Sequence, residues 1–68
     1  NDEIINKIQQ TMDELPESLR IAIELREFEG KNYEEMALIM NCPLGTVRSR
    51  LYRAREILDV QLQLLVVG

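Results

Sequence analysis

The chain has 68 residues, of which 46% are hydrophobic and 29% are charged, and its formal net charge is −4. A chain of this length forms at most one domain with a small core, which leaves little room for a deep active site. Because the sequence has no His and only one Cys, it cannot provide imidazole-based catalysis, an internal disulfide or a multi-Cys zinc site, and we expect no enzyme activity, no metal and no cofactor.

The first half of the chain predicts two helices. Hydrophobic residues at helical spacing indicate a first helix over residues 2–14, with acidic residues in its first turn, where the helix dipole favours them. Pro16 ends this helix and suits the first turn of a second one. Gly30 is expected to end the second helix, because Gly adopts a positive φ at low cost. The predicted apolar stripe of this helix consists of Leu19, Ala22, Ile23 and Phe28.

The second half predicts two more helices joined by a short turn. Asn32 with Glu35 three residues later matches a capping box at the start of a third helix. Its predicted buried face consists of Met36, Ala37, Ile39 and Met40. Residues 41–43 form a turn in which Cys42 is expected to be a half-buried structural residue. A fourth helix begins near Pro43 or Leu44 and continues to about residue 65. Since no segment alternates with a period of two, the predicted fold is all-α with four helices.

A short helix, a tight turn and a longer Arg-rich helix form the layout of a helix-turn-helix. The charge distribution agrees with this layout. Residues 1–35 contain four basic and ten acidic residues, whereas residues 36–68 contain four basic and two acidic residues. All four basic residues of the second half are Arg and lie within residues 48–55. The negative net charge therefore does not describe the fourth helix, which is locally positive.

The two faces of the fourth helix differ in chemistry. At 100° per residue, one stripe about 80° wide is apolar and contains Leu44, Val47, Leu51, Ala54 and Leu58. The outward arc contains Thr46, Arg48, Ser49, Tyr52 and Arg53. Arg50 and Arg55 flank the apolar stripe, where their aliphatic stems cover apolar surface.

The outward arc has the side chains that a helix in the major groove of DNA requires. Arg donates two hydrogen bonds to guanine, and Ser and Thr bond to bases or phosphates. The helix N-terminus at Gly45 and Thr46 offers backbone amides to a phosphate. The competing interpretation is a merely solvated face, but such faces usually mix Glu with Lys. Here Lys is absent and the first acid is Glu56, so the pattern favours DNA binding.

Four blocks of the sequence resemble region 4 of bacterial sigma factors, and most closely the extracytoplasmic-function (ECF) class near the sigma-E and AlgU type. The blocks are Leu15–Arg20, Leu25–Gly30, Tyr33–Ala37 and Cys42–Arg55. The resemblance covers about residues 12–60, and the order and spacing of all four blocks make it specific. It implies that the fourth helix recognises the −35 promoter element within the RNA polymerase holoenzyme.

The resemblance also implies roles for individual residues. Family positions that read bases correspond to Arg48, Ser49, Tyr52 and Arg53. Family positions near the DNA backbone correspond to Arg26, Tyr33, Gly45 and Thr46. Arg50 and Arg55 match basic family positions, which implies phosphate contact or packing.

The expected partners are double-stranded promoter DNA, the RNA polymerase core through its β flap, and an anti-sigma factor. We expect no membrane insertion, because no stretch approaches about 20 apolar residues, and we expect a cytoplasmic location. Residues 1–68 are expected to form one region 4 domain, a fragment of a longer sigma factor since the chain lacks an initiator Met. Asn32 replaces the usual Ser or Thr cap. The tail of residues 62–67 is more apolar than the family pattern, which suggests that it covers a hydrophobic groove or lies at an oligomer boundary.

Two other functions remain open at this point. A response-regulator-type helix-turn-helix shares the order of helices, although the block from Gly45 to Arg55 favours the sigma factor. Alternatively, the chain is a small helical protein-interaction module whose arginines meet an acidic partner. Salt dependence and base preference of duplex binding separate these alternatives, because a DNA reader loses affinity steeply as salt rises.

Overall fold

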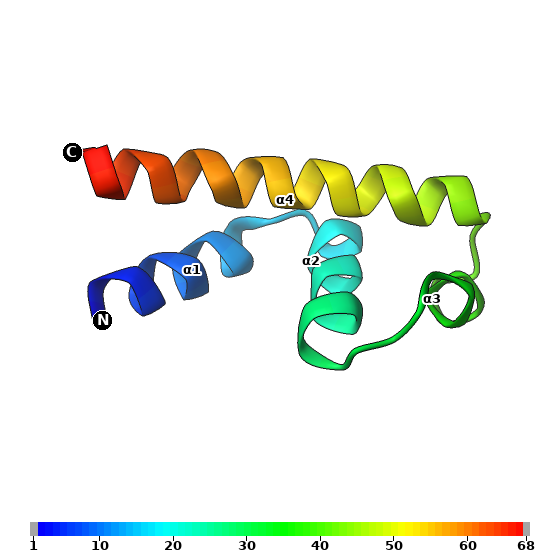
Figure 1. Cartoon of the computed structure of the whole chain (residues 1–68). Helices are drawn as coiled ribbons and strands as arrows, with labels where there is room; N and C mark the ends of the chain where they lie inside the picture. The colour runs from blue at the N-terminus through cyan, green and yellow to red at the C-terminus, as the bar shows by residue number, and fades with distance from the viewer. Residues whose placement is uncertain (1, 68) are drawn as a thin grey trace.

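One long helix, α4 (Leu44–Val67), extends along the whole molecule, and every other helix packs against it (Figure 1). The computed structural model describes the backbone of residues 2–67 and the side chains of residues 2–64. The other elements are α1 (Asp2–Glu14), α2 (Glu17–Ile23), the π-helical segment η1 (Glu24–Phe28) that continues α2, and α3 (Tyr33–Met40). Residues 2–67 contain no strand, so the prediction of an all-α, four-helix fold is confirmed.

The length of α4 sets the dimensions of the molecule. Its 24 residues correspond to about 36 Å of helix, close to the longest extent of the molecule, 38 Å. Helix α1 lies antiparallel to the C-terminal half of α4, α2 crosses beneath its middle, and α3 lies near its N-terminal end (Figure 1). The short α3, the turn and the N-terminal half of α4 therefore form the predicted helix-turn-helix, supported from below by α2.

The apolar stripe of α4 forms the centre of the core. Val47, Leu51 and Ala54 are buried, and Leu44 and Leu58 are half-buried, as the helical spacing predicts. The buried side chains that surround this stripe come from all the other helices and from the link after α1: Met12, Leu15, Leu19, Ala22, Ile23, Leu25 and Met36. Such a shared core fixes the orientation of α4 relative to α2 and α3.

The second helix follows directly on Pro16, which is its N-cap and not, as predicted, a residue of its first turn. The helix ends in a π-helical turn that the sequence pattern does not reveal. The Glu29 amide donates to the Glu24 carbonyl at 3.0 Å, five residues back. Gly30 follows with φ +68°, the left-handed conformation expected of a glycine that ends a helix. The prediction that Phe28 belongs to the buried stripe is wrong, since 68% of it is exposed. Because a π-helical turn holds more residues than an α-helical one, the i, i+3, i+4 pattern does not extend through it.

Helix α3 starts with the predicted capping box. The Glu35 amide donates to the Asn32 side chain at 2.8 Å, and the Asn32 amide donates to the Glu35 carboxylate at 2.9 Å. Met36 is buried, but the prediction that Ile39 is buried is wrong, since 54% of it is exposed. The reason is that α3 has only eight residues and one helix, α4, to pack against besides η1, so its buried stripe is narrow.

The turn between α3 and α4 contains a left-handed residue. Asn41 has φ +53°, which Asn tolerates better than most residues. Cys42 is half-buried and packs against the core, as predicted.

The apolar tail is only partly within the described residues. Leu62 is half-buried and Leu64 is 62% exposed, whereas the side chains of residues 65–67 lie outside the part of the chain whose side chains are described. Within the described helices, none has both the length and the apolar character needed to cross a membrane.

Candidate nucleic-acid interface

The first three turns of α4 present a continuous polar face. Arg48, Ser49, Tyr52 and Arg53 are all exposed, and Tyr52 is exposed to 69%. They lie outside the buried stripe of the same helix, as the 100° spacing predicts. The Ser49 hydroxyl donates to the Thr46 carbonyl at 3.1 Å. Within residues 2–64, neither Arg48 nor Arg53 makes a hydrogen bond or an ion pair, so both guanidinium groups keep their donors for a ligand.

The N-terminus of α4 faces solvent next to this polar face. The Pro43 carbonyl accepts hydrogen bonds from the amides of Thr46 and Val47, at 3.0 and 3.2 Å. The amides of Leu44 and Gly45 precede these donors in the first helical turn, where the helix dipole is positive. Gly45 is exposed, and a Cβ added there would meet nothing within 4 Å. A phosphate group therefore has open access to this end of the helix.

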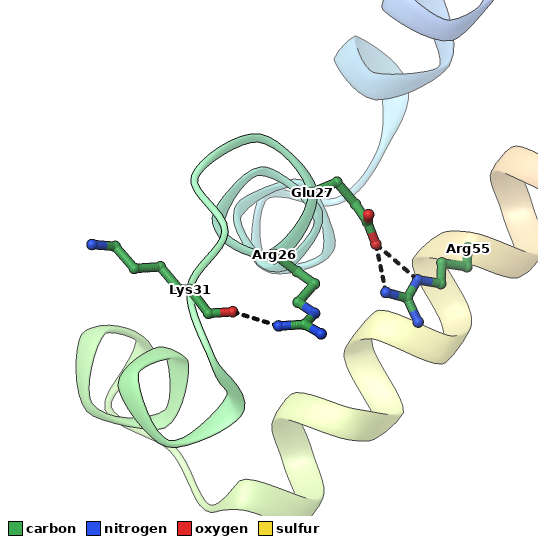
Figure 2. A network of polar contacts seen from close by, with 4 residues as sticks. All are labelled: Arg26, Glu27, Lys31 and Arg55. Carbon is green, nitrogen blue, oxygen red and sulfur yellow. Dashed lines mark hydrogen bonds and ion pairs between the residues drawn. The ribbon is translucent and has the colours of Figure 1, made fainter.

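One flank of the polar face contains a cluster around the Tyr33 ring. The guanidinium carbon of Arg26 lies 5.2 Å from the ring centroid, and that of Arg48 lies 5.9 Å from it. Arg26 also donates to the Lys31 carbonyl at 2.9 Å, while the Lys31 side chain points the opposite way (Figure 2). Three residues predicted for DNA contact, which come from η1, α3 and α4, are thus brought together.

Arg55 lies on the same side of α4 but is already paired. Its guanidinium donates two hydrogen bonds to one carboxylate oxygen of Glu27, one of them from Nε at 3.2 Å (Figure 2). The hydrogen bonds to Glu27 raise the pKa of Arg55 above its ordinary value, against a smaller opposing effect of burial. The side chain therefore stays positively charged throughout the neutral pH range.

The opposite flank is a groove between the start of α2 and the start of α4. Two arginines and three hydroxyl groups line it, together with Pro16 and Leu19; these polar residues are Ser18, Thr46, Ser49, Arg50 and Arg53. Ser18 and Arg50 also line an adjoining groove between α2 and α3, whose apolar lining consists of Ile21, Ile39 and Met40. The polar groove thus brings Arg50 and Arg53 of α4 next to Ser18 of α2.

Two residues of this surface were not predicted from the sequence. Ser18 joins the polar groove, and the only signal for it was its position in the first turn of the second helix, beside Pro16. Glu27 neutralises Arg55, and no spacing rule connects two residues 28 apart in the chain. Among the described residues, no group of three or more His, Cys, Asp or Glu side chains could hold a metal ion.

Comparisons with known proteins agree with this geometry. The family described as "Sigma-70, region 4" matches residues 5–58. The chain is 58% identical over 62 residues to the RNA polymerase sigma-H factor of Pseudomonas aeruginosa, which covers 91% of this chain and 32% of that protein. It is 52% identical over 66 residues to the ECF RNA polymerase sigma-E factors of Salmonella typhimurium and Escherichia coli, covering 97% of this chain and 35% of each relative. The chain thus spans about a third of the length of these curated relatives.

Proposed function

Because the chain belongs to the sigma-70 region 4 family, in its ECF branch, we propose that it binds the −35 element of promoter DNA as part of a sigma factor. In this role α4 lies in the major groove and directs RNA polymerase to the start of transcription. The family model and the relatives described above name sigma factors, which favours this function over the response-regulator alternative.

The observation that carries this proposal is the exposed face on the first three turns of α4, which has no acidic residue and lies on the side of the helix away from the buried stripe. Arg48, Ser49, Tyr52 and Arg53 are exposed on the first three turns of one helix, and the major groove is wide enough to admit an α-helix. We assign base reading to these four residues. Contact with the DNA backbone is assigned to the residues on both flanks and at the helix N-terminus: Arg26, Tyr33, Gly45, Thr46, Arg50 and Arg55.

The two flanks suit the two strands that border a major groove. Arg26 and Tyr33 lie on one side of α4, whereas Arg50 lies with Ser18 in the groove on the other side. Phosphate contacts on both sides fix the register of the helix without reading sequence. We therefore add Ser18 to the proposed backbone contacts, as a hydroxyl donor beside Arg50.

The proposal extends to protein partners and location. RNA polymerase core, through its β flap, and an anti-sigma factor are proposed partners, in a cytoplasmic, non-enzymatic protein whose residues 1–68 act as one domain. Exposed apolar side chains on α3 support contact with proteins, in particular Leu38 at 82% and Ile39 at 54% exposure.

The test is selection of bound sequences from a random duplex library with the purified chain, followed by salt titration of the best duplex. We expect one enriched motif and an affinity that falls linearly with log salt. The matched control is the R48A/R53A variant, which keeps the buried stripe and should enrich nothing. If the wild-type chain enriches no motif and shows no salt-dependent binding to any duplex, the chain is an interaction module instead of a promoter reader.

A further inference from the structure

The two arginines proposed to read bases differ in how they are held. Arg53 is exposed and, within the described residues, makes no hydrogen bond, ion pair or ring contact. Arg48 is also exposed, but its guanidinium carbon lies 5.9 Å from the centroid of the Tyr33 ring. A cation over an aromatic face is attracted by the negative charge density of that face. The side chain of Arg48 is therefore restrained before DNA binds, whereas that of Arg53 has no such contact within the described residues.

The Tyr33 ring is itself held in place. Tyr33 is the first residue of α3, directly after Asn32, whose side chain and amide exchange hydrogen bonds of 2.8 and 2.9 Å with Glu35. The ring is half-buried and packs against the core. Because both its backbone and its body are fixed, the ring offers Arg48 a platform with little freedom to move.

Arg26, which comes from η1, contacts the same ring. Its guanidinium carbon lies 5.2 Å from the ring centroid, and its Nη1 donates to the Lys31 carbonyl at 2.9 Å. Figure 2 shows Arg26 extending from η1 toward α4 while anchored at the loop that leads into α3. The ring, the loop and η1 thus form one connected support beside α4.

We propose that Tyr33 is a positioning residue for DNA sequence recognition, which uses its ring face to hold Arg48 in the orientation that reads one base pair. This inference rests on the proposed DNA-binding function and changes the role proposed for Tyr33 from contact with the DNA backbone to support of Arg48. A restrained Arg loses less rotamer freedom when it forms its two hydrogen bonds to guanine, so the ring contributes to discrimination at the base pair of Arg48. Arg53 does not depend on it.

The DNA experiment compares Tyr33→Leu with Tyr33→Phe on a panel of duplexes substituted one base pair at a time. We expect Tyr33→Leu to lower affinity for the preferred duplex by about ten-fold and to weaken preference at the base pair that Arg48→Ala also affects. The preference that Arg53→Ala affects should remain, and Tyr33→Phe should behave like wild type. The double variant Y33L/R48A should lose no more than R48A alone.

Three results of this experiment would overturn the proposal. An equal loss for Tyr33→Phe and Tyr33→Leu would assign the effect to the hydroxyl. An equal loss on all duplexes would assign it to phosphate contact. A loss of both arginine-dependent preferences in a variant whose circular dichroism spectrum matches that of the wild type would show that Tyr33 does not act specifically on Arg48.

A second measurement needs no DNA, so it separates a failure of this inference from a failure of the proposed function. In proton NMR of the free wild-type chain, the side-chain protons of Arg48 should be shifted upfield by the Tyr33 ring, whereas those of Arg53 should not. Tyr33→Phe should keep the shift. Equal chemical shifts for Arg48 and Arg53 in the wild type would refute the inference, even if Tyr33→Leu failed to fold.

Discussion

Arg55 on α4 and Glu27 at the end of the second helix are joined by two hydrogen bonds to one carboxylate oxygen, across 28 residues of sequence. Both side chains are almost half exposed, so the pair contributes little to folding. Its main effect is electrostatic: it places a negative charge beside the proposed DNA face and occupies one of the four arginines of α4. Glu27 therefore opposes phosphate binding.

Replacement of Glu27 by Gln should increase affinity for all duplexes. The change removes the carboxylate and releases Arg55 for a phosphate, so the slope of log affinity against log salt should become steeper by about one unit. The free energy of unfolding should fall by less than about 1 kcal/mol. Salt titrations of binding and urea unfolding measure the two effects. Glu29→Gln, which changes the charge equally at an exposed residue, is the control, and an identical slope in both variants would contradict the role of Glu27.

Replacement of Arg53 by Ala should weaken binding to the preferred duplex by about 1–3 kcal/mol and relax the preference at one base pair. The reason is that its exposed guanidinium has no partner within the described part of the protein and remains free for a base edge. Lys7→Ala, which removes the same charge from α1, should change affinity only slightly. Competition binding with a panel of duplexes measures both effects. An equal loss of affinity for preferred and scrambled duplexes would show that Arg53 contacts a phosphate and does not read a base.

Replacement of Gly45 by Ala should affect the stability of the fold and its affinity for DNA in opposite directions. A Cβ at this position meets nothing within 4 Å, and Ala is the better helix former, so stability should rise by up to about 1 kcal/mol. Affinity for all duplexes should nevertheless fall roughly tenfold, a steric cost of about 1.4 kcal/mol, if the DNA backbone approaches the helix N-terminus closely. Unchanged affinity would show that this end of α4 is not a contact.

Gly30→Ala is the matched control for that variant. Gly30 has φ +68°, a conformation that costs a residue with a Cβ about 1–2 kcal/mol. This variant should therefore lose stability while its folded fraction keeps wild-type affinity, the reverse of the outcome expected for Gly45→Ala. Thermal unfolding together with binding to the selected duplex compares the two.

Replacement of Leu51 by Ala should cost about 2–5 kcal/mol of stability, because Leu51 is only 1% exposed at the centre of the core. In a domain of this size such a loss approaches the whole free energy of unfolding, typically about 5 kcal/mol. Leu38→Ala, at a side chain 82% exposed, should change stability by less than about 0.5 kcal/mol. Similar urea midpoints for the two variants would contradict the assignment of the core.

Features governed by short-range rules were predictable from the sequence. The buried stripe of α4 follows from helical periodicity, and the capping box of Asn32 and Glu35 follows from a spacing of three residues. The same periodicity places Arg48, Ser49, Tyr52 and Arg53 on one exposed face. The reading of bases by these four residues stays a prediction.

Features that depend on tertiary geometry were not predictable. The Glu27–Arg55 pair and the gathering of Arg26 and Arg48 on Tyr33 arise because α3 packs against both η1 and α4, which brings residues far apart in the sequence together. The exposure of Phe28 follows from a π-helical turn, whose wider hydrogen-bonding pattern has no simple sequence signature.

The continuity of α4 has a mechanical consequence. The first half of this helix carries the side chains proposed to face DNA, and the second half packs along α1, without a break between them (Figure 1). Because a helix without a kink keeps its direction along its length, the orientation of α1 and the orientation of the polar face of α4 are set together. A protein that binds α1 at one end of the molecule therefore also sets the orientation of Arg48 and Arg53 at the other end.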